Sequence, residues 1–195
     1  DLLIVGMGGS GVAGDVLKLV LNETTQINVE VRKAYGIPEV VADRRPKCLF
    51  ISYSGNTEET VEAVYDAIKY KLDWSVISSG GQLLELATDH KRPFVKVPPG
   101  LQPRAAFGLM TKAVMHYVSS DKDGKYLEMC NQAGDYLNEV LANQSENELL
   151  TQALNISKEI STKTSVIYGG TPLTYLIAQR WNCLLYTSPS PRDDR

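Results

Sequence analysis

Three hydroxyl side chains lie close together directly after a short apolar run. The run is Leu49–Ile51, and the hydroxyls belong to Ser52, Ser54 and Thr57. An amphipathic segment follows from Val61, so the pattern predicts a strand, a tight turn and the start of a helix. A helix N-terminus offers backbone N–H groups and a partial positive charge to an anion. With three neutral hydroxyl donors added, this turn is a candidate binding site for a small phosphate monoester.

A purely structural explanation of the same turn is also open, because serine-rich turns often cap helices. Asn56 and Glu59 have the three-residue spacing of a capping box, which predicts that the helix begins there. The turn contains no lysine, and no Gly-Lys pair precedes a Ser or Thr as in loops that bind nucleoside triphosphates. The residues of the turn therefore argue against a triphosphate site and leave a phosphate ester and a capping turn as alternatives.

A second, glycine-rich turn follows the first apolar run of the chain. Gly6, Gly8 and Gly11 match the G-x-G-x-x-G spacing of dinucleotide-binding turns, and Glu30 lies about twenty residues further on. An NAD(P)-binding Rossmann domain is therefore an alternative. Two points weigh against it: this short motif is unspecific by itself, and Ser10 places a hydroxyl where pyrophosphate sites rely on bare backbone.

Apolar runs and amphipathic segments alternate along the first part of the chain. The predicted strands are 2–5, 27–31, 49–51, 74–77 and 94–97, and a helix is predicted over 107–118 after the last of them. This alternation predicts an α/β three-layer sandwich with a parallel sheet. Ligands bind beyond the carboxyl ends of such strands, so the turns at Gly9 and Ser52 and the loop at Arg104 are expected at one edge. The Arg104 guanidinium suits an oxyanion, although a surface position would also explain it.

Apolar spacing also predicts which faces of two helices are buried. In the first helix the expected stripe is Val12, Val16, Leu19 and Val20. In a later helix it is Leu149, Ala153, Ile156 and Ile160, which we expect to pack on a core.

Composition and charge exclude several classes of protein. Hydrophobic residues make up 43% and charged residues 22% of the chain, as in an ordinary globular protein. The net charge of −3 and the lack of a basic cluster argue against a nucleic-acid partner. The sequence has neither a membrane-spanning apolar run nor a signal peptide, so we expect a cytoplasmic protein without a membrane partner.

The cysteines and histidines do not predict a metal site. Cys48, Cys130 and Cys183 are too far apart in sequence for a disulfide framework or a zinc motif, and Cys48 is expected to be a small core residue. Only two histidines are present: His90 is expected at an exposed helix end, and His116 is expected to be structural.

The sequence predicts an incomplete two-domain protein. Residues 1–120 would form the first α/β domain, 121–163 a helical connection, and 164–182 the start of a second domain with a strand at Ser165–Gly170. The chain opens at Asp1 without a methionine, directly on an apolar run. Residues 183–195 resemble the translation of a transposon adapter used in sequencing libraries, so we expect a non-native tail on a fragment.

Several short motifs, taken in order over residues 1–182, resemble one enzyme family. They are Gly6–Gly11, Tyr35–Pro38, Ser52–Thr60, Ser79–Gly81, Pro103–Ala106 and Val166–Gly169. The chain is similar in these motifs to the bifunctional phosphoglucose/phosphomannose isomerases, which belong to the sugar isomerase (SIS) superfamily. The resemblance implies a flavodoxin-like SIS domain, the start of a second one, and a homodimer in the full-length protein. It also implies interconversion of glucose 6-phosphate or mannose 6-phosphate with fructose 6-phosphate, without a metal or cofactor.

The resemblance also implies roles for individual residues. Ser52, Ser54 and Thr57 would bind the phosphate, Gly9 and Ser10 would contact the sugar, and Arg104 would stabilise a cis-enediolate intermediate.

In this family the carboxylate base is a glutamate directly after the Arg-Trp pair that matches Arg180-Trp181, and a ring-opening histidine lies beyond it. The tail replaces both, so the resemblance implies an inactive fragment that binds sugar phosphate weakly or not at all. Another member of the superfamily, a non-catalytic sugar-phosphate-sensing domain of a regulator, remains an alternative to the enzyme.

Overall fold

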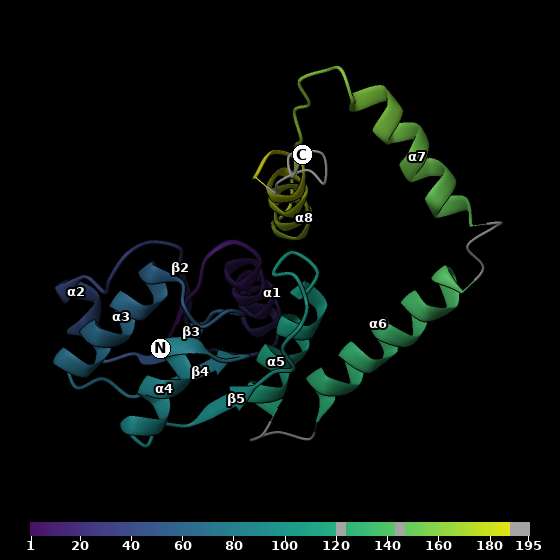
Figure 1. Cartoon of the computed structure of the whole chain (residues 1–195). Helices are drawn as coiled ribbons and strands as arrows, with labels where there is room; N and C mark the ends of the chain where they lie inside the picture. Colours follow the sequence, from purple (N-terminus) through teal and green to yellow (C-terminus); the bar gives the residue numbers. More distant parts are fainter. Residues whose placement is uncertain (120–123, 143–146, 188–195) are drawn as a thin grey trace.

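A parallel β-sheet lies at the centre of the protein (Figure 1). The computed structural model describes residues 1–119, 124–142 and 147–187. Its five strands are β1 (Leu2–Val5), β2 (Val29–Arg32), β3 (Lys47–Ile51), β4 (Trp74–Ser78) and β5 (Phe94–Lys96). Their order is β2-β1-β3-β4-β5, and every neighbouring pair is parallel. This is the order of flavodoxin-like sheets and not that of the Rossmann fold.

Helices cover both faces of the sheet, which confirms the predicted three-layer sandwich (Figure 1). On one face lie α1 (Gly8–Thr24) and α5 (Phe107–Ser119); on the other lie α2 (Glu39–Ala42), α3 (Glu58–Lys69) and α4 (Gly81–Asp89). Side chains alternate along each strand, so Ile4 and Leu49 pack toward α1 and α5 while Leu3 and Phe50 pack toward α3 and α4. Such double burial explains why β1 and most of β3 are continuous apolar runs.

Helix α1 buries the predicted stripe only in part: Val12 is buried, and Val16 and Val20 pack against the core at its margin. Its fully buried apolar side chains are Val12, Ala13, Leu17 and Leu21, whereas Val16, Leu19 and Val20 are only half-buried. The reason is close packing through a glycine: a Cβ on Gly14 would lie 2.9 Å from the Ile4 side chain. A count of apolar side chains overlooks such a face, because the glycine that lies closest to the sheet carries no side chain.

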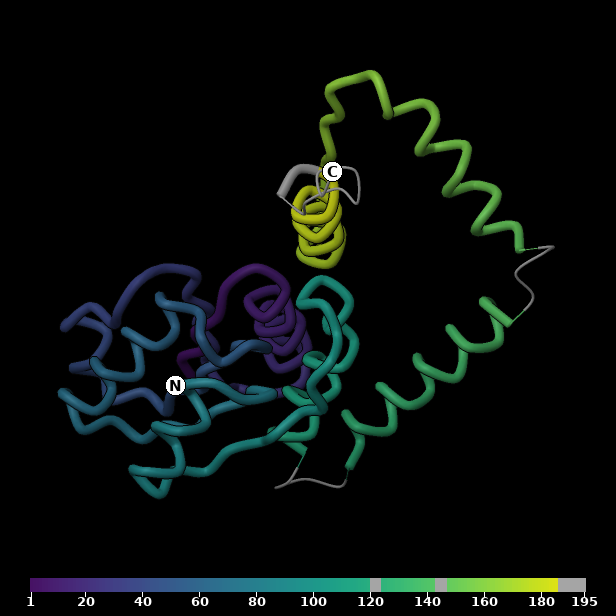
Figure 2. The backbone as a smooth tube through the Cα atoms, viewed as in Figure 1, coloured from purple at the N-terminus to yellow at the C-terminus, as the bar shows by residue number. Residues whose placement is uncertain are grey.

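Three more helices follow the sandwich as an extended arm (Figure 2). They are α6 (Lys125–Leu141), which packs on α5, then α7 (Glu148–Ile160), and α8 (Pro172–Asn182), which returns to pack on α1. The predicted helical connection is therefore helical where it is described. No residue of α7 is buried, and Leu149 is 51% exposed. The expectation that Leu149, Ala153, Ile156 and Ile160 pack on a core is wrong for this structure.

Residues 165–170 do not form the expected strand. A strand needs a neighbour for its backbone hydrogen bonds, and none of the five described strands pairs with this segment. The helix expected after it is present as α8, whose N-terminus is capped by Thr171. In the predicted tail, residues Cys183–Thr187 extend α8 as a short π-helix, and residues 188–195 lie outside the described part of the chain.

The two histidines are both exposed. This agrees with the prediction for His90 but not for His116, which lies on the outer face of α5 and has no structural role in the core. Within the described residues, no helix has the length and apolar character needed to cross a membrane.

Candidate functional site

The three predicted phosphate-binding hydroxyls form one cluster at the carboxyl end of β3. The Ser52 Oγ lies 2.7 Å from the Thr57 Oγ1 and 3.5 Å from the Ser54 Oγ. Ser52 is buried, Thr57 is half-buried and Ser54 is exposed, so the cluster runs from the protein interior to the surface. We call Ser52, Ser54 and Thr57 the hydroxyl cluster.

The hydroxyl cluster lies at the N-terminus of α3. Thr57 is the N-cap residue, but its side chain does not cap the helix and pairs with Ser52 instead. Two glutamates, Glu58 and Glu59, occupy the first helical turn. An anion beside the cluster would therefore meet hydroxyl donors together with the positive end of the α3 dipole.

The predicted capping box of Asn56 and Glu59 is wrong. The Asn56 side chain turns away from α3, and its Oδ1 accepts a hydrogen bond of 3.0 Å from the backbone N–H of Gln82 in α4. The next N–H of α4, from Leu83, donates to the Gly55 carbonyl over 3.0 Å. The turn after β3 thus caps the neighbouring helix, and α4 in return fixes the shape of the turn.

Glycine is required at the tip of this turn. Gly55 has a φ of 73°, a left-handed conformation that favours glycine, and a Cβ there would collide with the Gly80 carbonyl oxygen. The buried Gly55 N–H donates to the Ser52 Oγ over 3.1 Å. The Ser79 hydroxyl also donates to the Tyr53 carbonyl over 2.6 Å. The Ser79–Gly81 segment therefore packs against the turn that carries the hydroxyl cluster and stabilises it.

A tyrosine joins this turn to the loop that leads to Arg104. The Tyr53 hydroxyl donates to the Pro98 carbonyl over 3.0 Å and accepts from the Leu101 N–H over 2.9 Å. Nothing in the sequence around Tyr53 pointed to this role, because its partners lie 45 and 48 residues away. The contact places the loop after β5 beside the loop after β3.

The glycine-rich turn after β1 reaches the same edge of the sheet. Gly9 and Ser10 lie in the first turn of α1, so they belong to a helix and not to a loop. A Cβ on Gly9 would be 3.7 Å from the Pro103 carbonyl oxygen, directly before Arg104. Gly9 thus adjoins the Arg104 loop, while the side-chain hydrogen bonds of the hydroxyl cluster, among the residues that the structure describes, join its own members and their turn.

The two carboxylates in the first turn of α3 interact electrostatically with a tyrosine. The charge of Glu58, and then that of Glu59, raises the pKa of Tyr35 above its ordinary value. Glu30, the acid of the dinucleotide alternative, forms a 2.6 Å ion pair with Arg44. Together with the sheet order, this surface pairing disfavours a Rossmann site.

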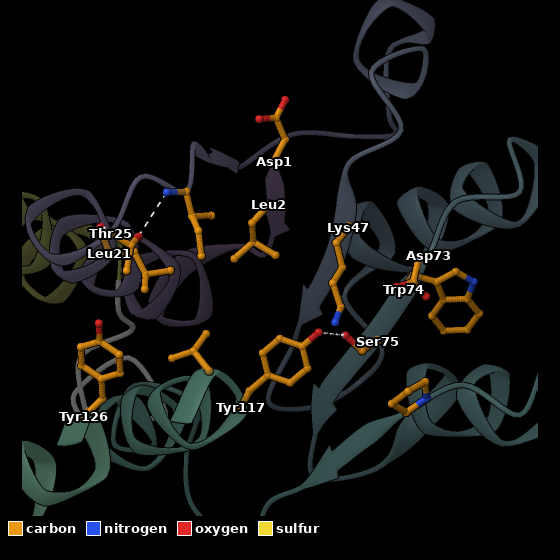
Figure 3. A pocket seen from close by; sticks show the side chains of 13 residues that line it. Asp1, Leu2, Leu21, Thr25, Lys47, Asp73, Trp74, Ser75, Tyr117 and Tyr126 are labelled. Carbon is orange, nitrogen blue, oxygen red and sulfur yellow. Dashed lines mark hydrogen bonds between the residues drawn. The ribbon is translucent and has the colours of Figure 1, made fainter. Parts of the chain in front are cut away.

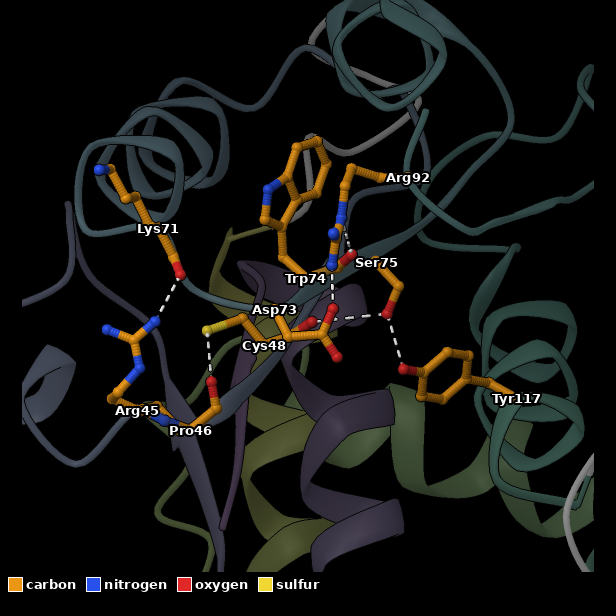
Figure 4. Close-up of polar contacts among 9 residues, drawn as sticks. All are labelled: Arg45, Pro46, Cys48, Lys71, Asp73, Trp74, Ser75, Arg92 and Tyr117. Carbon is orange, nitrogen blue, oxygen red and sulfur yellow. Dashed lines mark hydrogen bonds and ion pairs between the residues drawn. The ribbon is translucent and has the colours of Figure 1, made fainter. Parts of the chain in front are cut away.

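A cavity of about 520 Å³ lies at the opposite edge of the sheet (Figure 3). It is lined by Leu2, Lys47 and Trp74, the first residues of β1, β3 and β4. The hydroxyls at its wall already bond one another: Ser75 donates to Tyr117 over 2.7 Å (Figures 3 and 4). Parallel sheets of this kind bind ligands at the carboxyl edge, so this cavity is not the preferred candidate site.

Comparison with known proteins connects the chain to sugar-phosphate enzymes. Residues 1–71 match the SIS domain family. The chain is 36% identical over 183 residues to the bifunctional phosphoglucose/phosphomannose isomerase of Thermoplasma acidophilum, which covers 93% of the chain and 53% of that protein. It is 31% identical to the protein of the same name from Caldicellulosiruptor bescii, over 92% of the chain and 54% of that protein.

A solved structure shares the fold. The crystal structure of tagatose-6-phosphate ketose/aldose isomerase from Escherichia coli superposes with a TM-score of 0.56 at 16% identity, covering 72% of the chain and 42% of that protein. At this identity the likeness concerns the fold alone. The chain spans about half the length of the curated relatives it matches.

Proposed function

Because residues 1–71 match the SIS domain family, we propose that the chain supplies the phosphate-binding half of the active site of a sugar-phosphate isomerase. The reaction is the interconversion of glucose 6-phosphate or mannose 6-phosphate with fructose 6-phosphate through a cis-enediolate. The observation that carries this proposal is the hydroxyl cluster at the N-terminus of α3, with 2.7 Å between the Ser52 and Thr57 oxygens. Curated relatives that bear this activity in their names support it over nearly the whole chain.

Each element at the carboxyl edge has a separate task in this proposal. Ser52, Ser54 and Thr57 bind the phosphate as neutral donors, aided by the α3 dipole. Gly9 and Ser10 contact the sugar at the N-terminus of α1. The Arg104 guanidinium stabilises the negative charge that develops on the enediolate oxygens.

The proton transfer between C1 and C2 of the sugar requires a carboxylate base. Opening of the sugar ring requires a further acid–base group. We place both groups outside residues 1–182. Glu58 and Glu59 are not assigned the role of the base, because they lie in the first turn of α3 and their charges raise the pKa of Tyr35. We therefore propose that this chain alone is inactive, and that the full-length protein is a cytoplasmic homodimer active in glycolysis and gluconeogenesis.

A non-catalytic sugar-phosphate sensor would need the same hydroxyl cluster without the base. The two proposals separate in an assay of glucose 6-phosphate isomerisation by a full-length protein that contains residues 1–182. The enzyme is expected to be active and to remain active with a chelator present. Inactivity of a folded full-length protein that still binds fructose 6-phosphate would favour the sensor.

The kinetic effect of two substitutions in the same full-length protein tests the assigned roles. Arg104→Ala is expected to lower kcat by about 10²–10³ by removing stabilisation of the developing charge. Ser54→Ala is expected mainly to raise KM, since the phosphate does not change during the reaction. An unchanged kcat in Arg104→Ala would contradict the transition-state role.

A further inference from the structure

Arg180 of α8 contacts the predicted sugar-binding residues from a distant part of the sequence. Its Nη2 donates a 2.6 Å hydrogen bond to the carbonyl of Arg104, which lies 76 residues earlier. Its guanidinium lies over the Phe107 ring, 5.0 Å from the ring centroid. Its Nη1 is 3.5 Å from the position that a Cβ on Gly9 would occupy. One side chain thus meets the Arg104 turn, the start of α5 and the start of α1.

These contacts fall on a short turn between β5 and α5. Leu101, Gln102 and Pro103 are exposed, and the turn is closed locally by the N–H groups of Ala105 and Ala106, which donate to the Gln102 carbonyl over 2.8 and 3.1 Å. A charged donor on a carbonyl is stronger than a neutral one. A planar guanidinium can stack on an aromatic ring and donate in its own plane at the same time, which an ammonium cannot.

We propose that Arg180 is a positioning residue: it fixes the Arg104 turn against the N-terminus of α1, so that Arg104 and Gly9 meet the same sugar. The part that concerns the sugar rests on the proposed function. The part that concerns the turn does not, because it follows from the contacts of Arg180 alone. Arg180 acts through Arg104 and is not assigned a contact with the reacting atoms.

Hydrogen exchange of the chain, followed by NMR, tests the positioning without any ligand. Arg180→Ala is expected to speed exchange at the Ala105 and Ala106 amides about tenfold, because a charged hydrogen bond to the turn is lost. Arg180→Lys keeps the charge but not the planar stack, so it is expected to give a several-fold increase. Trp181→Ala, which changes an exposed neighbour on α8, is the matched control and is expected to leave both amides unchanged.

The buried residues Leu176 and Ala178 show whether α8 stays docked on α1 in these variants. If Arg180→Ala undocks α8, the test uses Arg180→Lys, provided that α8 stays docked in that variant. Faster exchange at Ala105 and Ala106 would then still support the positioning role of Arg180. Unchanged exchange at Ala105 and Ala106 in a variant with α8 docked would overturn the proposal.

A titration with two ligands tests the consequence for the sugar. Inorganic phosphate is expected to reach only the hydroxyl cluster, whereas fructose 6-phosphate also reaches Gly9 and Arg104. Arg180→Ala is therefore expected to raise the Kd of fructose 6-phosphate about tenfold and that of phosphate less than about twofold. An equal rise for both ligands would show a general structural effect and overturn the positioning role. If fructose 6-phosphate binds neither the unmodified chain nor a full-length protein that contains residues 1–182, the proposed function fails, and the exchange experiment still decides the positioning of the turn.

Discussion

At the scale of single residues, the hydroxyl cluster contains side chains with unequal structural tasks. Ser52 is buried and accepts from the Gly55 N–H, so it supports the turn that it belongs to. Ser54 is exposed, and its Oγ has long hydrogen bonds, at 3.3 Å from the Asn56 N–H and at 3.5 Å from the Ser52 Oγ. The sequence predicted that the three hydroxyls lie together. It did not predict which of them supports the turn, because the burial of each side chain depends on how α4 packs on the turn.

The two serines are therefore expected to respond differently to alanine substitution. Ser52→Ala leaves the buried Gly55 N–H without its acceptor and is expected to lower the free energy of unfolding by about 1–3 kcal/mol. Ser54→Ala is expected to change it by less than about 0.5 kcal/mol. Urea unfolding followed by circular dichroism measures both. Equal losses in the two variants would contradict the division of tasks.

Cys48 is a core residue, as predicted, and its thiol is hard to ionise. Burial, and secondly the charge of Asp73, raises the pKa of Cys48 from its ordinary value of 9.0 to about 12 (Figure 4). The unfolded chain loses this proton at lower pH than the folded chain, so the stabilisation is complete below about pH 9 and is lost toward about pH 12.

The pH dependence can be isolated with Cys48→Ala. Between about pH 9 and 12, the free energy of unfolding of the unmodified chain is expected to fall with rising pH, relative to that of Cys48→Ala, by up to about 1.4 kcal/mol per pH unit. Parallel stability curves for the two proteins over this range would show that the thiol ionises equally readily in both states.

At the scale of elements, the strands of the sheet and the bounds of α5 were predicted well, whereas the capping of α3 and α4 was not. The apolar runs located the five strands of the sheet, most clearly β1, β3 and β4, whose residues are almost all buried. At β2, Ile27 was included although it is 43% exposed and the strand begins at Val29. The strand expected at Ser165–Gly170 is not formed. The capping of α4 by Asn56 was missed because a capping box considers only neighbours in sequence. The positions of Tyr53 and Arg180 could not be predicted either, since each bonds a segment far away in the chain.

The cross-capping by Asn56 predicts a specific loss of stability. Asn56→Ala removes the acceptor for the Gln82 N–H and is expected to lower the free energy of unfolding by about 1 kcal/mol. Glu59→Ala is the control, because the structure gives Glu59 no capping bond, and it is expected to cost less than about 0.5 kcal/mol. Thermal or urea unfolding measures both variants. A larger loss of free energy of unfolding in Glu59→Ala than in Asn56→Ala would contradict the capping of α4 by Asn56 and favour the capping box at α3.

At the scale of the whole molecule, the α/β sandwich carries the candidate site, and the last helix of the arm, α8, packs next to that site. The loops after β1, β3 and β5 share the carboxyl edge, and α8 packs on α1 at the same place (Figure 1). The α/β alternation predicted this edge and its residues. It did not predict the return of α8, because that contact depends on the path of α6 and α7 between the two segments.

The most direct test of the central claim is an NMR titration of the chain with fructose 6-phosphate and, separately, with NADH. With half of the proposed site, we expect weak binding of fructose 6-phosphate, with a Kd of about 1 mM or above, and saturable shifts at the amides of Ser54–Glu58 and at Gly9. We expect no shifts with NADH. Shifts at the glycine-rich turn with NADH, and none at the hydroxyl cluster with fructose 6-phosphate, would contradict the account.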